Sequence, residues 1–277
     1  MLLLRMDHLM SMTSLTNKLY FSFLKYEKKN KKINVEMKFG KKTKFQYISD
    51  LHLETYKGFP KLPVAANNLI LAGDIGNPFK SNYRDFLSYC STKYEKTFLI
   101  PGNHEYWNHK SIYETDSYLF DITSKLNNVS FMKNKVTLFQ DTFIVGCVLW
   151  SSRNTKNTGG DEERIRVNTD FLNNLHVQDV NWLRLTLNSL IRYNKKVLVV
   201  THYLPSFNLM HEKYKNYPYP DRFYSNSDHL IENPIDTWIC GHTHCTMEKN
   251  INGVNFLVNS LGYVNNFQNK IKTVEIQ

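Results

Sequence analysis

The chain has 277 residues, of which 42% are apolar and 14% aromatic, a composition that excludes an intrinsically disordered protein. Its net charge of +10 lies mostly at the N-terminus: residues 1–44 hold 11 Lys or Arg and 3 Asp or Glu, whereas the other 233 hold 24 and 22. No apolar run approaches the roughly 18 residues that a membrane helix requires, so we expect no membrane span. Because the sequence shows neither a secretory signal nor a disulfide-type cysteine spacing, it predicts a cytoplasmic protein.

Residues 1–42 are predicted to be a basic, partly disordered extension, followed by one domain over residues 43–277. Within the extension, Leu15 to Tyr26 fits a short helix. Met37 is a candidate for an alternative translation start, because the regular pattern begins just after it. A basic tail of this kind can contact nucleic acid or acidic lipid, and a simple solvated tail is the other interpretation.

Downstream of residue 44, short apolar runs alternate with amphipathic stretches, in an order typical of α/β layered folds. Helices are predicted at residues 79–94, 111–126 and 178–193. Strands are predicted at residues 45–48, 68–71, 97–100, 136–139, 142–149, 196–201 and 236–240, with antiparallel strands in 245–276. Two loops interrupt this order, a polar one at 151–164 and an aromatic one at 203–224.

Polar side chains follow directly after five of the predicted strands, namely Asp50, Asp74, Asn103, His202 and His242. In open α/β sheets ligands bind at the carboxyl ends of the strands, so we expect these side chains to gather along one edge. Further histidines stand beside them in Asp-Leu-His52, Asn-His104 and His-Thr-His244. A set of carboxylate, amide oxygen and imidazole suits Mn, Fe, Zn or similar ions rather than calcium.

The motifs Asp-x-His, Gly-Asp, Gly-Asn-His-Glu, a single His after a strand and Gly-His-x-His occur in that order. This order resembles the calcineurin-like metallophosphoesterase superfamily, over residues 45 to about 260. The resemblance implies a four-layer α/β/β/α sandwich with a dinuclear metal centre at the carboxyl ends of its strands. It also implies hydrolysis of phosphoester bonds.

The resemblance further implies how seven ligands divide between two divalent metal ions. One ion would take Asp50, His52 and His244, the other Asn103, His202 and His242, and Asp74 would bridge them. His104 would not bind a metal ion and would lie by the phosphate as a catalytic residue. Manganese is one expected metal, and iron and zinc are others.

Two cations about 4 Å apart can hold a phosphate and share a hydroxide, which would attack phosphorus in line with the leaving alkoxide. A covalent enzyme intermediate is then unnecessary. His104 would stabilise the developing charge or protonate the leaving oxygen. We expect Glu105 or a backbone carbonyl to orient His104, because partners of this kind usually fix a catalytic imidazole.

Four residues near the predicted edge are candidate substrate contacts: Trp107, Trp150, Arg153 and Tyr203. The aromatic rings could stack on a nucleobase and the arginine could bind phosphate, whereas loop packing and ion pairs are the alternatives. The acidic run Asp161-Glu162-Glu163 is interpreted as a solvated loop, with a third acidic site as the alternative.

Two other functions are compatible with the same motifs. The basic extension and the aromatic residues favour a nuclease or another nucleic-acid processing phosphodiesterase, although the near-neutral body argues against a strong phosphate-tracking surface. A non-catalytic scaffold with this fold is the second alternative, although the ligand set is complete. The sequence leaves open the substrate, the identity of the metal and the oligomeric state.

Overall fold

The computed structural model describes residues 42–154, 160–263 and 271–276. All the elements below belong to the unit that spans Lys42–Gln277. The predicted extension up to residue 41, its helix at residues 15–26 and the alternative start at Met37 therefore lie outside the described residues. None of the helices in the described ranges has the length and hydropathy needed to cross a membrane.

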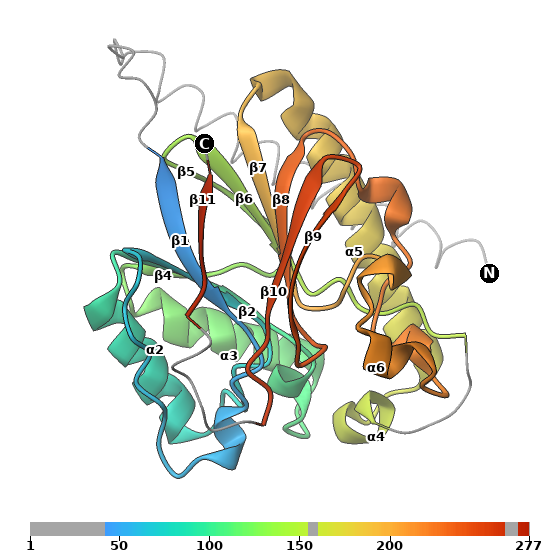
Figure 1. The fold of residues 1–277 in the computed structure, drawn as a ribbon. Coiled ribbons are helices and arrows are strands. Elements are labelled where there is room, and N and C mark those ends of the chain that lie inside the picture. The colour runs from blue at the N-terminus through green and yellow to red at the C-terminus, as the bar shows by residue number, and fades with distance from the viewer. Residues whose placement is uncertain (1–41, 155–159, 264–270, 277) are drawn as a thin grey trace, which may run out of the picture. The chain divides into compact units, whose positions relative to one another are not determined.

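Two sheets form the centre of the described domain (Figure 1). In the first sheet, four parallel strands are joined by one antiparallel strand at the edge. Its order is β11 (Thr273–Ile276), β1 (Thr43–Ile48), β2 (Asn68–Ala72), β3 (Lys96–Ile100) and β4 (Val129–Phe131). The order in the second sheet is β5 (Lys135–Phe139), β6 (Thr142–Cys147), β7 (Lys196–Thr201), β8 (Ile235–Cys240), β10 (Val254–Asn259) and β9 (Thr246–Ile251).

Helices connect the strands and cover the outer faces of the sheets. The α-helices are α2 (Ser81–Lys93), α3 (Ile112–Ser124), α4 (Asp161–Ile165), α5 (Thr169–Leu190) and α6 (Glu212–Lys215). Short 3-10 helices are η1 (Leu53–Thr55), η2 (His104–Tyr106), η3 (Ile191–Tyr193), η4 (Phe207–Leu209), η5 (Pro220–Arg222) and η6 (Asp228–Leu230). Helix α3 begins at a capping box in which Ser111 and Glu114 satisfy each other's backbone N–H groups.

Alternating side chains along the strands explain the layers, because successive residues of a strand point to opposite faces. In β2, Ile70 belongs to the core between the two sheets, whereas Leu69 and Leu71 pack with the residues of α2 and α3. In β7, Leu198 lies between the sheets, whereas Val199 packs with the residues of α5. The result is the predicted α/β/β/α sandwich, with α2 and α3 on one side and α5 on the other (Figure 1).

The elements differ from the sequence-based expectations at several places, among them the predicted aromatic loop 203–224, which contains α6. Helix α5 begins at Thr169 rather than 178, because Asn168 caps it and Leu172 is buried. The predicted polar loop at 151–164 contains the start of α4. Strand β4 was not predicted, because its three residues are too few to show an alternating pattern. The stretch 245–276 does not form one antiparallel group: β10 pairs with β8 in parallel, and β11 joins the other sheet.

Candidate metal centre

The loops after β1, β2, β3, β7 and β8 bring the seven predicted ligands and His104 to the same end of both sheets. Parallel bridges and backbone bonds tie these loops together; for example, the amide of Asp50 donates to the carbonyl of Gly73 and that of His52 to the carbonyl of Asp74. The side chains of Asp50, His52 and His202 are fully buried. Burial of so many polar groups is costly unless they bind one another or a cation.

The first group of ligand atoms comes from Asp50, His52 and His244. The Nε2 atoms of His52 and His244 lie 2.9 Å apart, and Oδ1 of Asp50 lies 3.4 Å from Nε2 of His244. That carboxylate oxygen is buried and accepts no hydrogen bond from any residue in the described ranges. Two imidazole nitrogens and an unsatisfied carboxylate oxygen directed at one point form a donor set that fits a divalent transition-metal ion.

The second group comes from Asp74, His202 and His242, with the amide of Asn103 beside them. Nε2 of His202 lies 2.9 Å from Oδ1 of Asn103, 3.1 Å from Nδ1 of His242 and 3.3 Å from Oδ1 of Asp74. On its other side, Nδ1 of His202 is 3.0 Å from the carbonyl oxygen of Ala72, to which it donates. This bond leaves Nε2 free as a ligand atom.

Charges in the centre favour ionised carboxylates and one neutral imidazole. Burial alone would raise the pKa of Asp74, but the nearby imidazoles of His202 and His104 hold it well below its usual range. Burial and the neighbouring His202 lower the pKa of His242 to about 3. A neutral imidazole has the free lone pair that a metal ligand needs.

Backbone strain is concentrated at the predicted ligands. Five of the seven have a positive φ, in the left-handed region that residues other than glycine seldom adopt: Asp50, His52, Asp74, His242 and His244. Strain of this kind costs about 1–3 kcal/mol per residue and clusters at functional sites. The structure also explains a glycine of the Gly-Asp motif, because a Cβ atom at Gly73 would collide with the ring of His202.

A family model described as calcineurin-like phosphoesterase matches residues 43–246 of the sequence. The chain belongs to this family. An uncharacterized protein of Acanthamoeba polyphaga mimivirus is 29% identical over 253 residues, which cover 79% of this chain and 90% of that protein. Among solved structures, phosphopantetheinyl hydrolase from Mycobacterium tuberculosis shares the fold, with a TM-score of 0.60 and 19% identity, over 81% of this chain and 91% of that one. Family membership supports a metal-dependent phosphoester hydrolase, with the two ligand groups as candidates for its metal site.

In this calcineurin-like phosphoesterase, the partner of His104 is Glu54, a residue that the sequence analysis missed. Oε1 of Glu54 lies 2.7 Å from Nδ1 of His104 and 3.2 Å from Nδ1 of His52. Burial would raise the pKa of Glu54, but these imidazoles lower it to about 2. A signal for this pairing was present in the spacing Asp-x-His-x-Glu, since the left-handed turn at His52 starts the 3-10 helix that carries Glu54.

Glu105, one of the two partners expected for His104, does not orient it, because its carboxylate binds backbone amides instead. Its Oε2 atom accepts hydrogen bonds from the amides of Gly102 (2.7 Å) and Asp74 (3.0 Å), and its Oε1 atom from Ile75 (2.8 Å). Burial and the charge of Asp74 raise the pKa of Glu105 to about 7. The carboxylate thus joins the two ligand loops that follow β2 and β3.

Asp161 is neither solvated nor part of a third acidic site, because it is buried against the second ligand group. Its Oδ1 atom accepts hydrogen bonds from Nδ2 of Asn103 and Nε1 of Trp107, both at 2.9 Å. Its Oδ2 atom accepts from the hydroxyl of Tyr203 at 2.9 Å and pairs with Arg153. Burial would raise the pKa of Asp161, but the charge of Arg153 holds it below its ordinary value.

Three of the four predicted substrate contacts are buried: Trp150 is 1%, Arg153 3% and Tyr203 0% exposed. The two aromatic rings are therefore packed in the interior and the guanidinium forms buried ion pairs, which are the alternatives given above. None of the three side chains offers an exposed face to a substrate. Trp107 is less buried, with its ring centroid 3.5 Å from that of His104, and the guanidinium of Arg164 lies 4.9 Å from the Trp107 ring.

Tyr263 is an exposed aromatic residue beside the first ligand group that the sequence analysis did not select. Its ring stacks on that of His52, with centroids 4.5 Å apart and planes 27° apart, and it is 61% exposed. No motif marks this position, since the contact joins segments more than 200 residues apart in the chain.

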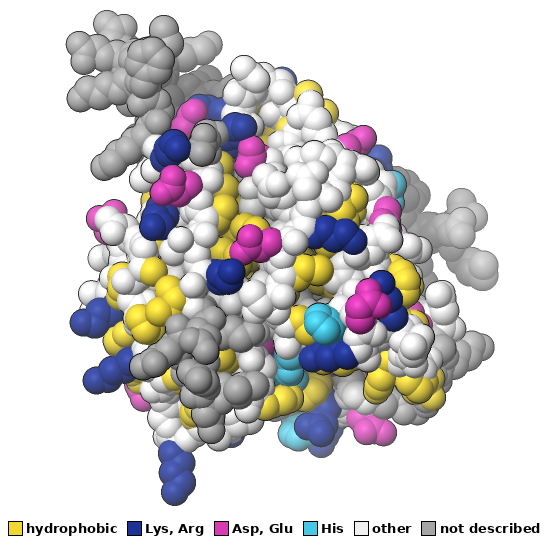
Figure 2. Space-filling model, in the orientation of Figure 1, with side chains coloured by type: hydrophobic (Ala, Val, Ile, Leu, Met, Phe, Trp, Pro, Cys, Tyr) yellow, Lys and Arg dark blue, Asp and Glu magenta, His cyan; other side chains and the backbone are white. Residues whose placement is uncertain are grey.

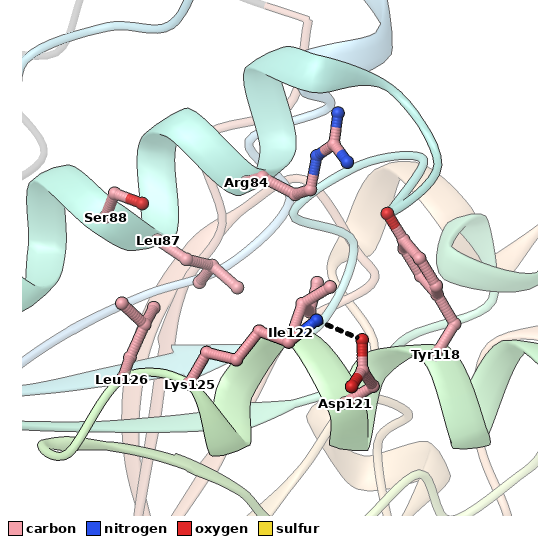
Figure 3. A pocket seen from close by; sticks show the side chains of 8 residues that line it. All are labelled: Arg84, Leu87, Ser88, Tyr118, Asp121, Ile122, Lys125 and Leu126. Atoms are coloured by element: carbon pink, nitrogen blue, oxygen red, sulfur yellow. Dashed lines mark hydrogen bonds and ion pairs between the residues drawn. The ribbon is translucent and has the colours of Figure 1, made fainter.

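A separate cavity of about 290 Å³ lies between α2 and α3 (Figure 3). Arg84 and Leu87 line it from α2, and Tyr118 and Ile122 line it from α3. Asp121 and Lys125, which line it from the same side as Ile122, form an exposed ion pair with a 2.6 Å separation. The cavity contains none of the candidate ligands and does not belong to the metal centre.

Proposed function

We propose that this calcineurin-like phosphoesterase hydrolyses phosphoester bonds with a dinuclear metal centre built by its seven predicted ligands, in the domain that we place at residues 43–277. The observation that carries this proposal is two of the three candidate ligand groups, Asp50–His52–His244 and Asp74–His202–His242, each with two buried members and one partly buried histidine. We assign the third group, His52–Glu54–His104, to the orientation of His104. Asn103 completes the second group, and Asp74 is the carboxylate we assign to both ions.

Two bound divalent ions would make a hydroxide available near neutral pH and would offset the negative charge of the phosphate oxygens. The side chains of Glu54 and His104 would supply the proton for the leaving oxygen. Nδ1 of His104 is held by Glu54, so Nε2 is the nitrogen available to the phosphate or the leaving oxygen; it lies 3.8 Å from Oδ2 of Asp74. A proton delivered from there would assist departure of the alkoxide, a contribution of typically ~10²–10⁴-fold.

The distribution of charge on the surface of the domain helps to distinguish nucleic acid from smaller substrates. Figure 2 shows basic and acidic side chains interspersed on the face it presents, with no continuous basic stripe. A protein that follows a nucleic-acid backbone usually has such a stripe. We therefore favour small phosphoesters or phosphorylated proteins as substrates, and the test includes DNA and RNA so that a nuclease would be detected.

The experiment is a substrate panel on metal-analysed protein with Mn²⁺, covering p-nitrophenyl phosphate, its bis ester, nucleotides and nucleic acids. Turnover of at least one ester is expected, and Asp74→Asn should reduce it by at least 10³-fold. Asp121→Asn is the matched control, because this exposed aspartate of α3 pairs with Lys125 and lies beside a cavity that contains none of the candidate ligands. Metal-loaded protein that hydrolyses nothing in the panel would contradict the proposal.

A further inference from the structure

We infer that Asp161 is a positioning residue for the second metal ion, because its carboxylate fixes which way the amide of Asn103 faces. This inference rests on the proposed dinuclear centre. It gives a functional role to α4, a helix that lies outside the five sequence motifs. Asp161 lies in α4, which is 58 residues after Asn103 in the chain.

The two sides of the Asn103 amide have different partners. Its Nδ2 atom donates to Oδ1 of Asp161 at 2.9 Å, and its Oδ1 atom lies 2.9 Å from Nε2 of His202. Both side chains are buried, Asn103 at 3% and Asp161 at 7% exposure. An ionised carboxylate only accepts hydrogen bonds, so the nitrogen of the amide must face Asp161. The amide oxygen, the only atom of the group that can bind a cation, is then turned toward the second ligand group.

Other donors hold the carboxylate of Asp161 in place. The indole of Trp107 shares Oδ1 with Asn103, and Tyr203 and Arg153 occupy Oδ2. Arg153 continues the network through its Nη1 atom, 2.7 Å from Oε2 of Glu162. Each partner of Asp161 is a donor, which is the arrangement that keeps a buried carboxylate ionised and immobile.

The isosteric change Asp161→Asn discriminates between positioning and simple packing. The new amide has one oxygen, and the permanent charge of Arg153 attracts it to that side. Its NH₂ group would then face the NH₂ group of Asn103. The indole N–H of Trp107 would face the same NH₂ group, and Asn103 relieves its part of the clash by reversing its amide, which turns a nitrogen that binds no cation toward His202.

The experiment measures Mn²⁺ stoichiometry and affinity by calorimetry and elemental analysis. Wild-type protein should bind two ions, whereas Asp161→Asn should keep the first and bind the second about 10–100-fold more weakly, the usual effect of losing such an outer partner. The matched control is Glu162→Gln, which weakens the ion pairs of Glu162 with Arg153 and Arg222 but removes no contact of Asn103. It should bind both ions with affinities within about twofold of the wild type.

A second variant exchanges the two groups. In Asn103→Asp/Asp161→Asn the carboxylate stands on the ligand side and the amide behind it, so the second ion should be recovered to within about tenfold of wild type. Its failure to recover the second ion would overturn the inference, even if Asp161→Asn alone does not fold. Two ions bound by Asp161→Asn with unchanged affinities would overturn the inference and leave the proposed function intact. Fewer than two ions in the wild type would overturn both.

Discussion

Oε1 of Glu54 lies 2.7 Å from Nδ1 of His104, and this contact sets the orientation of the only histidine in the motif set that we do not assign to a metal ion. A carboxylate on Nδ1 keeps the proton there and leaves Nε2 for the substrate. Glu54→Gln should therefore lower kcat by about 10–100-fold without changing the metal content. The loss should be larger for an alkyl ester than for p-nitrophenyl phosphate, because a poor leaving group depends more on proton delivery.

A double-variant comparison separates this role from a general effect on the site. In a His104→Ala background, Glu54→Gln should change kcat by less than about twofold, because the residue it positions is gone. An equal loss of kcat in both backgrounds, measured by steady-state kinetics with metal-analysed protein, would mean that Glu54 acts through His52 instead.

Removal of metal is expected to destabilise the domain. Buried Asp50 and Asp74 lie at the two candidate ligand groups, and a cation held there would stabilise the folded state only. At 100 times its dissociation constant such a ligand contributes about 2.7 kcal/mol. For a domain of this size the loss corresponds to a fall in Tm of about 5–10 °C, measured by calorimetry with and without chelator. Asp50→Asn removes a ligand of the first ion only and should show a smaller shift in Tm, and an equal shift in that variant would place the first ion away from Asp50.

Glu105 should matter for stability more than for catalysis. Its carboxylate accepts the amides of Gly102, Asp74 and Ile75, and the NH₂ group of a glutamine would face some of these donors. Glu105→Gln should lower the free energy of unfolding by about 3 kcal/mol in urea titrations. The exposed Glu163→Gln is the control and should change it by less than about 0.5 kcal/mol. If Glu105→Gln and Glu163→Gln have equal free energies of unfolding, Glu105 does not have the structural role described above.

His176 should make stability depend on pH. Nδ1 of this half-buried residue lies 2.8 Å from the carbonyl oxygen of Trp150, and burial lowers its pKa below 6.5. The unfolded chain then binds the proton more readily, so the contribution of His176 is present above pH 6.5 and is lost as the pH falls below it. In urea titrations of metal-free protein at pH 7.5 and 5.5, His176→Gln should lose less stability on acidification than the wild type. His109→Asn, at an exposed position, should behave like the wild type, and an identical pH dependence of all three would contradict the prediction.

The positions of five of the proposed ligands were predictable because each follows a strand, and the motifs added His52 and His244. Parallel strands end at the same edge of their sheet, so Asp50, Asp74 and Asn103 meet without any knowledge of side-chain contacts. The pattern of apolar residues likewise predicted most strands and an α/β layered fold, whereas the two-sheet sandwich was implied only by the resemblance to the family.

The residues that position the ligands were not predictable from local pattern. Glu105 adjoins His104 in sequence, which made it the natural candidate, yet the turn at His52 brings Glu54 to the imidazole instead. Asp161 lies in a polar stretch without periodicity, and its contact with Asn103 depends on tertiary packing. Arg153 shows the same limit: a lone arginine near a phosphate site suggests a ligand, and only the fold reveals that Asp161 and Glu162 neutralise it.

The claim that one edge of this fold holds two metal ions is tested most directly by anomalous diffraction from crystals of the protein grown with Mn²⁺. We predict two peaks about 3.5–4 Å apart. One should lie against Asp50, His52 and His244, the other against Asn103, His202 and His242, with Asp74 touching both. A single peak, or manganese bound away from these side chains, would contradict the account.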